Sequence, residues 1–347
     1  MTLALSPPTS APPVAAGLRC VRLDPVAWAR QAASSPRPLG GLGWGIAAPG
    51  LAGLELPVLS EGGPLVDAWL GQGGTQRQGR NGAVQWQADD RWAFGQLDLP
   101  DVDGDLSGVA RQAYLDIFTA LRACGHTQVL RLWNYLPRIN GDGGGLERYR
   151  QFNIGRQQAF MEAGHDAFEG APAACALGLP DARDMPGGGL HLRFLAASKA
   201  PRPLENPRQV PAYRYSSTYG PRAPTFSRAA LADAGGGRVA LFVSGTASIV
   251  GEHSVHHGDV LAQARETLVN LQAVLDAANA RCTAGFTFDD LHCTVYVRHA
   301  GDAAAVLALL AAAQPGAPAP LCVQADVCRA ELLVEIEAHA FAPGALA

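Results

Sequence analysis

Two glutamates near the C-terminus are the first residues whose type and spacing suit them for chemistry. Glu335 and Glu337 lie in the segment VEIEA, where apolar and acidic residues alternate. In a β-strand this alternation puts both carboxylates on one face, opposite Val334 and Ile336. That face is either solvated or lines a polar cavity, because a carboxylate in an apolar core is costly. In a cavity, burial would raise the pKa of Glu335 and fit it for proton transfer.

Cys328 is the thiol that can share a site with these acids. It precedes Glu335 by seven residues, across the turn that we expect between the last two strands, so both side chains can reach one cavity. The chain has seven scattered cysteines without a CxxC pair, which predicts neither a disulfide framework nor a zinc site. Most of them are expected to be small buried side chains, and burial in a strand is the alternative for Cys328 as well.

Arginines form a second signal, because their planar side chains pair well with carboxylates. Arg148, Arg150 and Arg156 lie within about two turns of an expected helix, with Tyr149 among them. One face of this helix can bind an anion, and a solvated amphipathic helix is the alternative. The connecting segment 200–229 is rich in proline, arginine and tyrosine, unlike a flexible linker. We expect it to be ordered and to complete a dicarboxylate pocket.

Other kinds of site lack support in the sequence. The histidines of HSVHH, residues 253–257, have no matching acidic or thiolate partner, so we predict an exposed loop and no metal site. The glycines of GDGGG, residues 141–145, lack the spacing of a nucleotide-binding loop and predict a turn before a helix. A GxSxG motif is absent, which leaves a serine hydrolase without support.

Composition narrows the partners and the location. A formal net charge of −4 and a pI near 6.1 give no basic surface for nucleic acid or anionic membranes. Prolines interrupt the N-terminal segment, which also lacks a basic start, so no secretory signal is predicted and a cytoplasmic location is expected. The small-apolar run 303–313 is too short to cross a bilayer and predicts a buried helix.

The elements that must position these residues follow one pattern that occurs twice. In the second half, hydrophobic periodicity predicts the order β-α-β-α-β-β, in residues 238–249, 259–280, 291–302, 303–313, 320–328 and 331–341. The first half repeats this order in residues 91–100, 106–125, 127–137, 146–164, 173–180 and 189–197. This pattern predicts an α+β (α/β) fold, a tandem of two related units with helices on one face of each mixed sheet.

The predicted division of the chain follows from this repeat. We expect a disordered tail at residues 1–18, an N-terminal domain at residues 19–205 and a C-terminal domain at residues 206–347. The seam between two related units is a natural cleft, lined by both of them. The functional site is therefore expected at this seam, with Glu335 contributed by the second unit.

Residues 239–341 resemble the YjgF family of reactive-intermediate deaminases. The motifs LFVSGTASI, ARETLVNLQAVLDAA, LHCTVYVRHAGD and VEIEA follow the order of that family. The resemblance implies that Cys322 is the family's cysteine and that Glu335 is its water-orienting glutamate. The position of its carboxylate-binding arginine, two residues before the cysteine, is occupied by Pro320, which argues against ordinary imine hydrolysis.

Nearly the whole chain resembles the chorismatases, enzymes with a YjgF-like (chorismate mutase-like) fold. The motifs that carry this resemblance are RLWNYLPRIN, GLERYRQFNIGRQQAF, ENPRQVPAYRY, YGPRAPTFSRA and SGTASIVGEHS. It implies hydrolytic removal of pyruvate from chorismate without a metal or organic cofactor. A positioned carboxylic acid can protonate the vinyl methylene of the enolpyruvyl ether, so Glu335 is expected to donate that proton or to position water.

The resemblance also implies substrate-binding residues and a product. The expected contacts to the carboxylates and ring hydroxyl of chorismate are Arg148, Tyr149, Arg156, Tyr215, Arg222, Gly245 and Thr246. Chorismatases that form an aromatic product carry a cysteine and a glycine at the positions that Cys328 and Gly245 match. We therefore expect 3-hydroxybenzoate, with or without 4-hydroxybenzoate.

Three alternatives remain open from the sequence. A chorismate hydrolase would stop at the dihydroxycyclohexadiene carboxylate. A YjgF-type imine hydrolase would act on a different substrate, and a non-catalytic small-molecule-binding protein would keep the pocket without needing Glu335. A monomer or a small homo-oligomer is expected, with a trimer among the options because YjgF units are commonly trimeric.

Overall fold

The computed structural model describes residues 17–48, 50–101, 104–179 and 189–347. Within these ranges, no helix is long and apolar enough to cross a membrane. The tail predicted at residues 1–18 lies outside the described residues up to position 16. Leu18 itself is buried, and its N–H donates to the carbonyl of Ala234 at 2.7 Å.

The first predicted unit forms a mixed sheet that is extended at both edges. The six elements of the repeat are β7 (Trp92–Pro100), α2 (Leu106–Cys124), β8 (Gln128–Pro137), α3 (Arg148–Glu162), β9 (Ala173–Leu179) and β10 (Gly189–Ala197). The hairpin of β5 (Arg77–Asn81) and β6 (Val84–Ala88) adds to one edge, and β18 (Asp326–Val327) adds to the other. The resulting seven-stranded order is β18-β9-β8-β10-β7-β6-β5.

The second unit forms a six-stranded sheet with the order β11-β12-β13-β19-β16-β17. Its elements are β11 (Arg202–Leu204), β12 (Ala229–Gly235), β13 (Arg238–Ala247), α4 (Val260–Asn279), β16 (His292–Val297), α5 (Ala303–Ala313), β17 (Leu321–Gln324) and β19 (Val334–Pro343). A short hairpin of β14 (Ile249–Val250) and β15 (His253–Ser254) follows β13. His253 lies in β15, and His256 and His257 follow that strand; all three side chains are exposed, as predicted for HSVHH.

The two units share one topology, which confirms the predicted tandem fold. The first runs β7-β10-β8-β9 across its sheet, and the second runs β13-β19-β16-β17. In each unit the second and third strands of the repeat are parallel, while the last strand is antiparallel to both of its neighbours. Both units connect their strands in the same order, as the repeated pattern in the sequence predicts.

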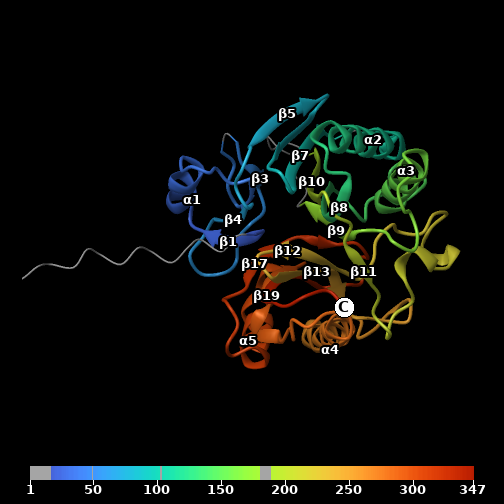
Figure 1. Ribbon diagram of the computed structural model, residues 1–347. Coiled ribbons are helices and arrows are strands. Elements are labelled where there is room, and N and C mark those ends of the chain that lie inside the picture. The colour runs from blue at the N-terminus through green and yellow to red at the C-terminus, as the bar shows by residue number, and fades with distance from the viewer. Residues whose placement is uncertain (1–16, 49, 102–103, 180–188) are drawn as a thin grey trace, which may run out of the picture.

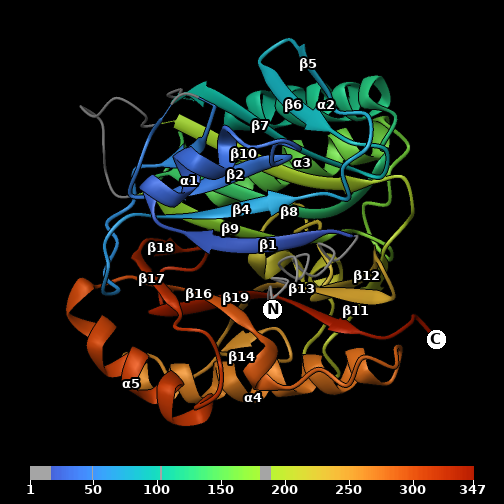
Figure 2. The same ribbon diagram turned by 60° about the vertical axis from the view of Figure 1, so that its left-hand side comes forward.

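The two sheets pack face to face, with helices on the outer faces (Figures 1 and 2). Helices α2 and α3 cover the seven-stranded sheet, and α4 and α5 cover the six-stranded sheet (Figure 2). Each helix presents an apolar stripe to its sheet: Ile117 and Leu121 of α2 and Leu271 and Leu275 of α4 are at most 1% exposed. Helices therefore cover only one face of each sheet, and the inner faces meet.

A third, four-stranded sheet was not predicted from the sequence. It comprises β1 (Arg19–Leu23), β4 (Leu65–Leu70), β2 (Gly40–Trp44) and β3 (Ala52–Leu54), and α1 (Pro25–Ala32) packs against it. Its Trp69 contacts Trp133 of one large sheet and Phe242 of the other, at 5.7 and 6.1 Å between ring centroids. The four-stranded sheet thus closes one side of the space between the two large sheets. Glycines fill three of the five positions of β2, so the strand gives no alternating pattern.

Two further predictions need correction. The segment 320–328 was predicted as one strand, but β17 pairs with β16 in the six-stranded sheet and β18 pairs with β9 in the seven-stranded sheet. The chain therefore crosses from one sheet to the other just before Cys328. The helix at 303–313 is present, yet only Ala303, Val306 and Leu310 are buried. Alanines lose little when they face solvent, so an apolar run of this composition does not require complete burial.

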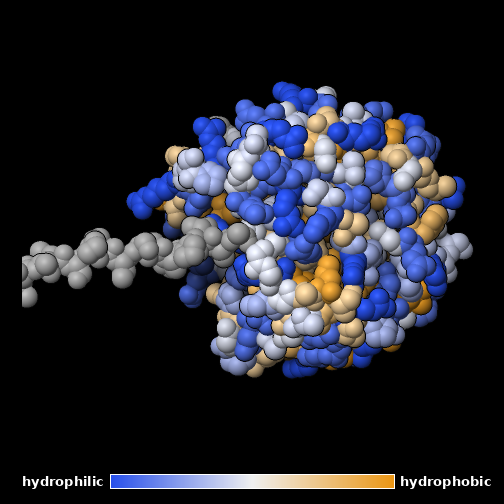
Figure 3. All heavy atoms as spheres, viewed as in Figure 1, coloured by the Kyte–Doolittle hydropathy of each residue, from blue (hydrophilic) through white to orange (hydrophobic). Residues whose placement is uncertain are grey.

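The polarity of the surface is consistent with burial of most large apolar side chains. The face shown in Figure 3 is mostly hydrophilic, with apolar residues in small separate patches.

Strand β11, which ends one residue before the predicted domain boundary at 205, pairs with β12 of the second unit. The proposed division at 205 and 206 therefore separates two hydrogen-bonded strands and remains a prediction.

Candidate active site

A cavity of about 260 Å³ lies where the connecting segment covers the ends of β13 and β19. Both units and the connecting segment contribute to its wall, as expected for a site at the seam. Its lining residues are Glu147, Tyr149, Arg150, Tyr215, Thr218, Tyr219, Pro224, Phe226, Arg228, Gly245, Ala247, Ile249, Cys328, Arg329, Ala330, Glu331 and Glu335. Three arginines and three glutamates face a partly aromatic wall, so the cavity can hold a small polar anion.

Glu335 lies at the inner end of this cavity, near the start of β19. Strand alternation places it on the face toward the seven-stranded sheet, while Val334 and Ile336 are in the core under α4. It is 3% exposed, and no donor among the described residues forms a hydrogen bond with its carboxyl. Burial, followed by the charge of Glu337, raises its pKa to about 8. At neutral pH this carboxyl is therefore mostly protonated and can act as an acid.

Gly245 makes room for this carboxyl. A Cβ atom on Gly245 would lie 1.9 Å from Oε1 of Glu335 and 2.7 Å from its Cδ. The pairing of β13 with β19 is irregular between Val243 and Thr246, so the backbone at Gly245 comes close to the acid. The absence of a side chain at Gly245 is therefore what allows this close approach.

Cys328 reaches the same cavity from the loop between β18 and β19. Burial and the nearby Glu335 raise the pKa of its thiol to about 12. The carbonyl of Cys328 accepts a hydrogen bond from Asn140 at 3.2 Å, which ties the loop to the first unit. A thiol with this pKa keeps its proton at neutral pH, so it is suited to contact a ring or relay a proton and not to attack as a thiolate.

Two of the three arginines of the cavity, Arg228 and Arg329, contact the ring of Tyr215. The guanidinium of Arg228 lies 5.5 Å from the Tyr215 ring centroid and donates to its hydroxyl at 2.6 Å. Arg329 lies 5.1 Å from the same ring and 3.8 Å from that of Tyr219, and it donates to the carbonyl of Glu252 at 2.9 Å. Both guanidinium groups are held by stacking and by fixed acceptors, which prepares them to bind a carboxylate.

The cavity contains some of the residues expected to bind substrate, and others lie elsewhere. Tyr149, Tyr215 and Gly245 line it together with Glu335 and Cys328. The remaining expected contacts, Arg148, Arg156, Arg222 and Thr246, are not part of the lining.

Each of these four residues has a different role in the fold. Arg148 forms a buried ion pair with Asp101 and donates to the carbonyl of Pro137 at 2.9 Å. Arg156 is 1% exposed and donates to Asn153 at 3.1 Å. Arg222 is exposed, and the Thr246 hydroxyl donates to the carbonyl of Ser244 at 2.9 Å. Direct contacts of these side chains with a ligand in the cavity are not supported by this arrangement.

Arg228 and Arg329 were not selected from the sequence, although weak signals existed. Arg228 is the penultimate residue of the motif YGPRAPTFSRA, and Arg329 directly follows Cys328. Neither residue shows a spacing that distinguishes it from a surface arginine. Their role depends on the fold of the connecting segment, which brings Tyr215 into contact with both.

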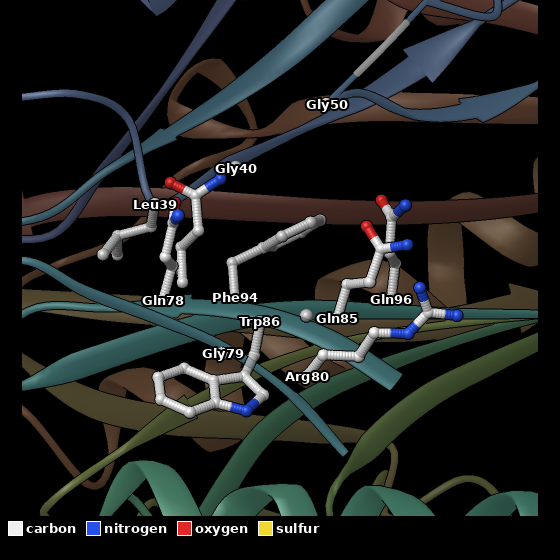
Figure 4. A pocket seen from close by; sticks show the side chains of 12 residues that line it. Leu39, Gly40, Gly50, Gln78, Gly79, Arg80, Gln85, Trp86, Phe94 and Gln96 are labelled. Carbon is white, nitrogen blue, oxygen red and sulfur yellow. The ribbon is translucent and has the colours of Figure 1, made fainter. Parts of the chain in front are cut away.

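A larger hollow of about 560 Å³ lies elsewhere, between β2 and the strands β5, β6 and β7. Gln78, Gln85, Gln96 and Arg80 project over it, with Phe94 beside them (Figure 4). It contains no carboxylic acid, thiol or histidine among its lining residues. The described residues also contain no group of three or more His, Cys, Asp or Glu placed to hold a metal ion. Glu335 and Cys328 therefore distinguish the smaller cavity from this hollow.

Comparison with known proteins identifies the family of this chain. The family model "Chorismatase FkbO/Hyg5-like, N-terminal" matches residues 67–196, and "Endoribonuclease L-PSP" matches residues 225–342. A 3-hydroxybenzoate synthase of Streptomyces hygroscopicus is 36% identical over 79% of this chain and 81% of its own length. A chorismatase of Streptomyces rapamycinicus is also 36% identical, with the same coverage of both chains. This chain belongs to the chorismatase family.

A solved structure extends the likeness to the whole fold. The crystal structure of a chorismatase superposes with a TM-score of 0.80 and 28% identity, covering 94% of this chain and 98% of the other. The expected family is thereby confirmed, and so is the α+β tandem fold. Because only 6% of the chain lies outside this coverage, it includes most of residues 19–70, which contain the four-stranded sheet that the sequence did not predict.

Proposed function

We propose that this enzyme cleaves chorismate to pyruvate and 3-hydroxybenzoate, alone or together with 4-hydroxybenzoate. The observation that carries the proposal is Glu335, a buried acid that faces the cavity without a hydrogen-bonding partner among the described residues and has a pKa raised to about 8. The relatives named 3-hydroxybenzoate synthase and chorismatase support the same activity. The protein needs neither a metal nor an organic cofactor for this reaction.

The cavity chemistry fits the steps that chorismate requires. Protonation of the vinyl methylene by Glu335 produces an oxocarbenium ion at the enolpyruvyl carbon. Water adds to this carbon, and cleavage of the bond between the carbon and the ether oxygen gives pyruvate and a ring diol that retains the oxygen. Loss of one water from this diol gives the aromatic product. Arg228 and Arg329 lie in the same wall and pair with the two carboxylates of chorismate.

Incubation of the purified protein with chorismate tests this proposal. We expect one pyruvate per chorismate and a matching amount of hydroxybenzoate, measured by a coupled lactate dehydrogenase assay and by chromatography. Pyruvate with only the dihydroxycyclohexadiene carboxylate would indicate the hydrolytic alternative. Absence of pyruvate release would contradict the proposal and leave the imine hydrolase and the non-catalytic binding protein as explanations.

Cys328 is proposed to set the product. Aromatisation requires a proton and a hydroxyl to leave the ring, and a thiol against the ring can relay a proton whereas a valine of similar size cannot. Cys328→Val is expected to shift the product toward the non-aromatic diol by at least fivefold, with the rate of pyruvate release within roughly threefold of the parent. Cys322→Val is the matched control, because Cys322 is buried in the core under α4. An unchanged product ratio in Cys328→Val would show that this residue does not set the outcome.

Arg329 is proposed to bind a substrate carboxylate. Arg329→Gln is expected to raise KM for chorismate roughly tenfold or more, because a charge-assisted hydrogen bond is lost. Arg222→Gln is the control, since Arg222 is exposed and outside the cavity lining. Steady-state kinetics of both variants decide the point, and equal KM values for the two would remove Arg329 from the binding site.

Location and assembly are also proposed. We infer a cytoplasmic enzyme that is a monomer or a small homo-oligomer, with no nucleic-acid or membrane partner. The tandem supplies one seam between related units within a single chain, which supports a complete site in a monomer. Sedimentation equilibrium tests this, and a trimer that dissociates with loss of activity would show that the site needs a second chain.

A further inference from the structure

Glu337 lies two residues beyond Glu335 on the same face of β19, and three donors among the described residues hold it. Arg131 donates to Oε2 in a buried ion pair, while the indole N–H of Trp133 and the hydroxyl of Tyr296 donate to Oε1 at 3.2 and 2.9 Å. Arg131 and Tyr296 are at most 2% exposed, and Glu337 is 5% exposed. All three partners donate, so Glu337 accepts from them as a carboxylate.

The donors are themselves fixed. The other terminal nitrogen of Arg131 donates to the carbonyl of Val243 at 2.9 Å, and its guanidinium lies 5.5 Å from the Trp133 ring centroid. The hydroxyl of Tyr296 is hydrogen-bonded to that of Tyr135 at 3.0 Å. Arg131, Trp133 and Tyr135 belong to β8 of the first unit, whereas Tyr296 and Glu337 belong to the second. The packing of one sheet on the other therefore creates this network.

The two glutamates of VEIEA are thus in opposite situations. Glu337 has three donors, and Glu335 has none among the described residues although both are buried. Two carboxylates this close on one strand do not ionise independently, and the one with donors takes the negative charge. The neighbour without donors then retains its proton.

We propose that Glu337 is a positioning residue for catalysis, whose fixed negative charge holds Glu335 in its acid form. This inference rests on the proposed function, because it explains how a carboxylic acid remains available to protonate an enol ether at neutral pH. Glu337 does not line the cavity, so it acts through Glu335 and not on the substrate.

The other charged groups around Glu335 do not replace this role. Arg131 and Arg228 lower its pKa, so they work against the acid form. Cys175 of β9 and Cys328 of the loop after β18 hold thiols whose pKa values burial raises. Tyr149 faces the cavity from α3, and burial raises its pKa as well. These three groups are neutral at neutral pH, so they do not supply the negative charge that, together with burial, raises the pKa of Glu335.

The test is the pH profile of Glu337→Gln. The amide keeps the shape and an acceptor oxygen for Arg131 but removes the charge, so Glu335 is expected to lose its proton at lower pH. The alkaline limb of kcat/KM for chorismate should move down by about one pH unit, which lowers activity roughly tenfold at pH 8.5 while activity at pH 6 changes little. A merely structural defect lowers activity at every pH and leaves the limb in place, and that result would overturn the proposal.

Two further measurements keep the test decisive. Glu337→Asp retains the charge and should restore the alkaline limb. Trp133→Phe removes one hydrogen-bond donor to Glu337 but leaves its carboxylate, so the alkaline limb should stay in place. Carbon-13 NMR titration of the Glu335 carboxyl, assigned with Glu335→Gln, follows its proton without any substrate. If the parent releases no pyruvate from chorismate, the proposed function fails, whereas this titration still reports on Glu337. An unchanged Glu335 titration in a folded Glu337→Gln protein would reject the inference.

Discussion

Glu335→Gln is expected to lower kcat for chorismate roughly a thousandfold, which is the size of effect associated with loss of a general acid. The amide has nearly the shape of the protonated carboxyl, and that carboxyl lacks a hydrogen-bonding partner among the described residues. The substitution therefore removes the transferable proton without disturbing a network. Substrate affinity, measured by calorimetry in the variant, should stay within about threefold of the parent value because the arginines remain.

The cavity offers a matched control for this variant. Glu331 also lines the cavity, and its carboxylate accepts a hydrogen bond from the Ser254 hydroxyl at 2.7 Å. Glu331→Gln removes a negative charge from the same wall without touching Glu335, so turnover should fall by less than about tenfold. Turnover of Glu335→Gln equal to that of Glu331→Gln would remove Glu335 from the mechanism.

The sequence predicted Glu335 because strand alternation is local. The pattern VEIEA shows that Glu335 and Glu337 share a face, and the fold confirms it. The pattern alone does not show what that face meets. Where the seven-stranded sheet packs on β19, Glu337 forms a buried ion pair, whereas Glu335 is a buried acid without a hydrogen-bonding partner among the described residues.

The arginines show where local reasoning fails. The helix around Arg148 was predicted and is present as α3, but its arginine points to Asp101. A periodic pattern gives the face of a helix and not the partner that this face meets. Asp101 lies 47 residues away in sequence, and no spacing rule connects the two. Arg150 of α3 does line the cavity, whereas the other two arginines of its wall, Arg228 and Arg329, depend on how two irregular segments fold over it.

Strand β2, which was not predicted, has a weak sequence pattern for a physical reason. In β2, GGLGW, glycine leaves no side chain at alternate positions, yet larger side chains would not fit. A Cβ on Gly40 would lie 2.2 Å from the Phe94 ring, and one on Gly43 would lie 2.6 Å from Leu51. Close packing of this sheet on its neighbours therefore requires glycine, and glycine gives no alternating pattern from which the strand could be predicted.

Gly245→Ala is expected to lower the rate of hydroxybenzoate formation at least tenfold. The new Cβ would lie 1.9 Å from Oε1 of Glu335, far inside van der Waals contact, so either the carboxyl or the strand must move. A displacement of about 1 Å is enough to misalign proton transfer by this order of magnitude. The backbone of Gly245 has no positive φ, which means that the alanine is disfavoured by the carboxyl and not by its own conformation.

A control variant separates the collision with Glu335 from the general effect of replacing a glycine by alanine. Gly301 has open space around its Cα and no positive φ, so Gly301→Ala should leave turnover and melting temperature close to those of the parent. In Gly245→Ala, replacement of Glu335 by the shorter aspartate should relieve part of the collision and recover more activity than the same Glu335→Asp change gives in the parent. Coupled effects of this kind are the signature of direct contact. Strictly additive losses in the double variant would show that Gly245 does not act through the position of the acid.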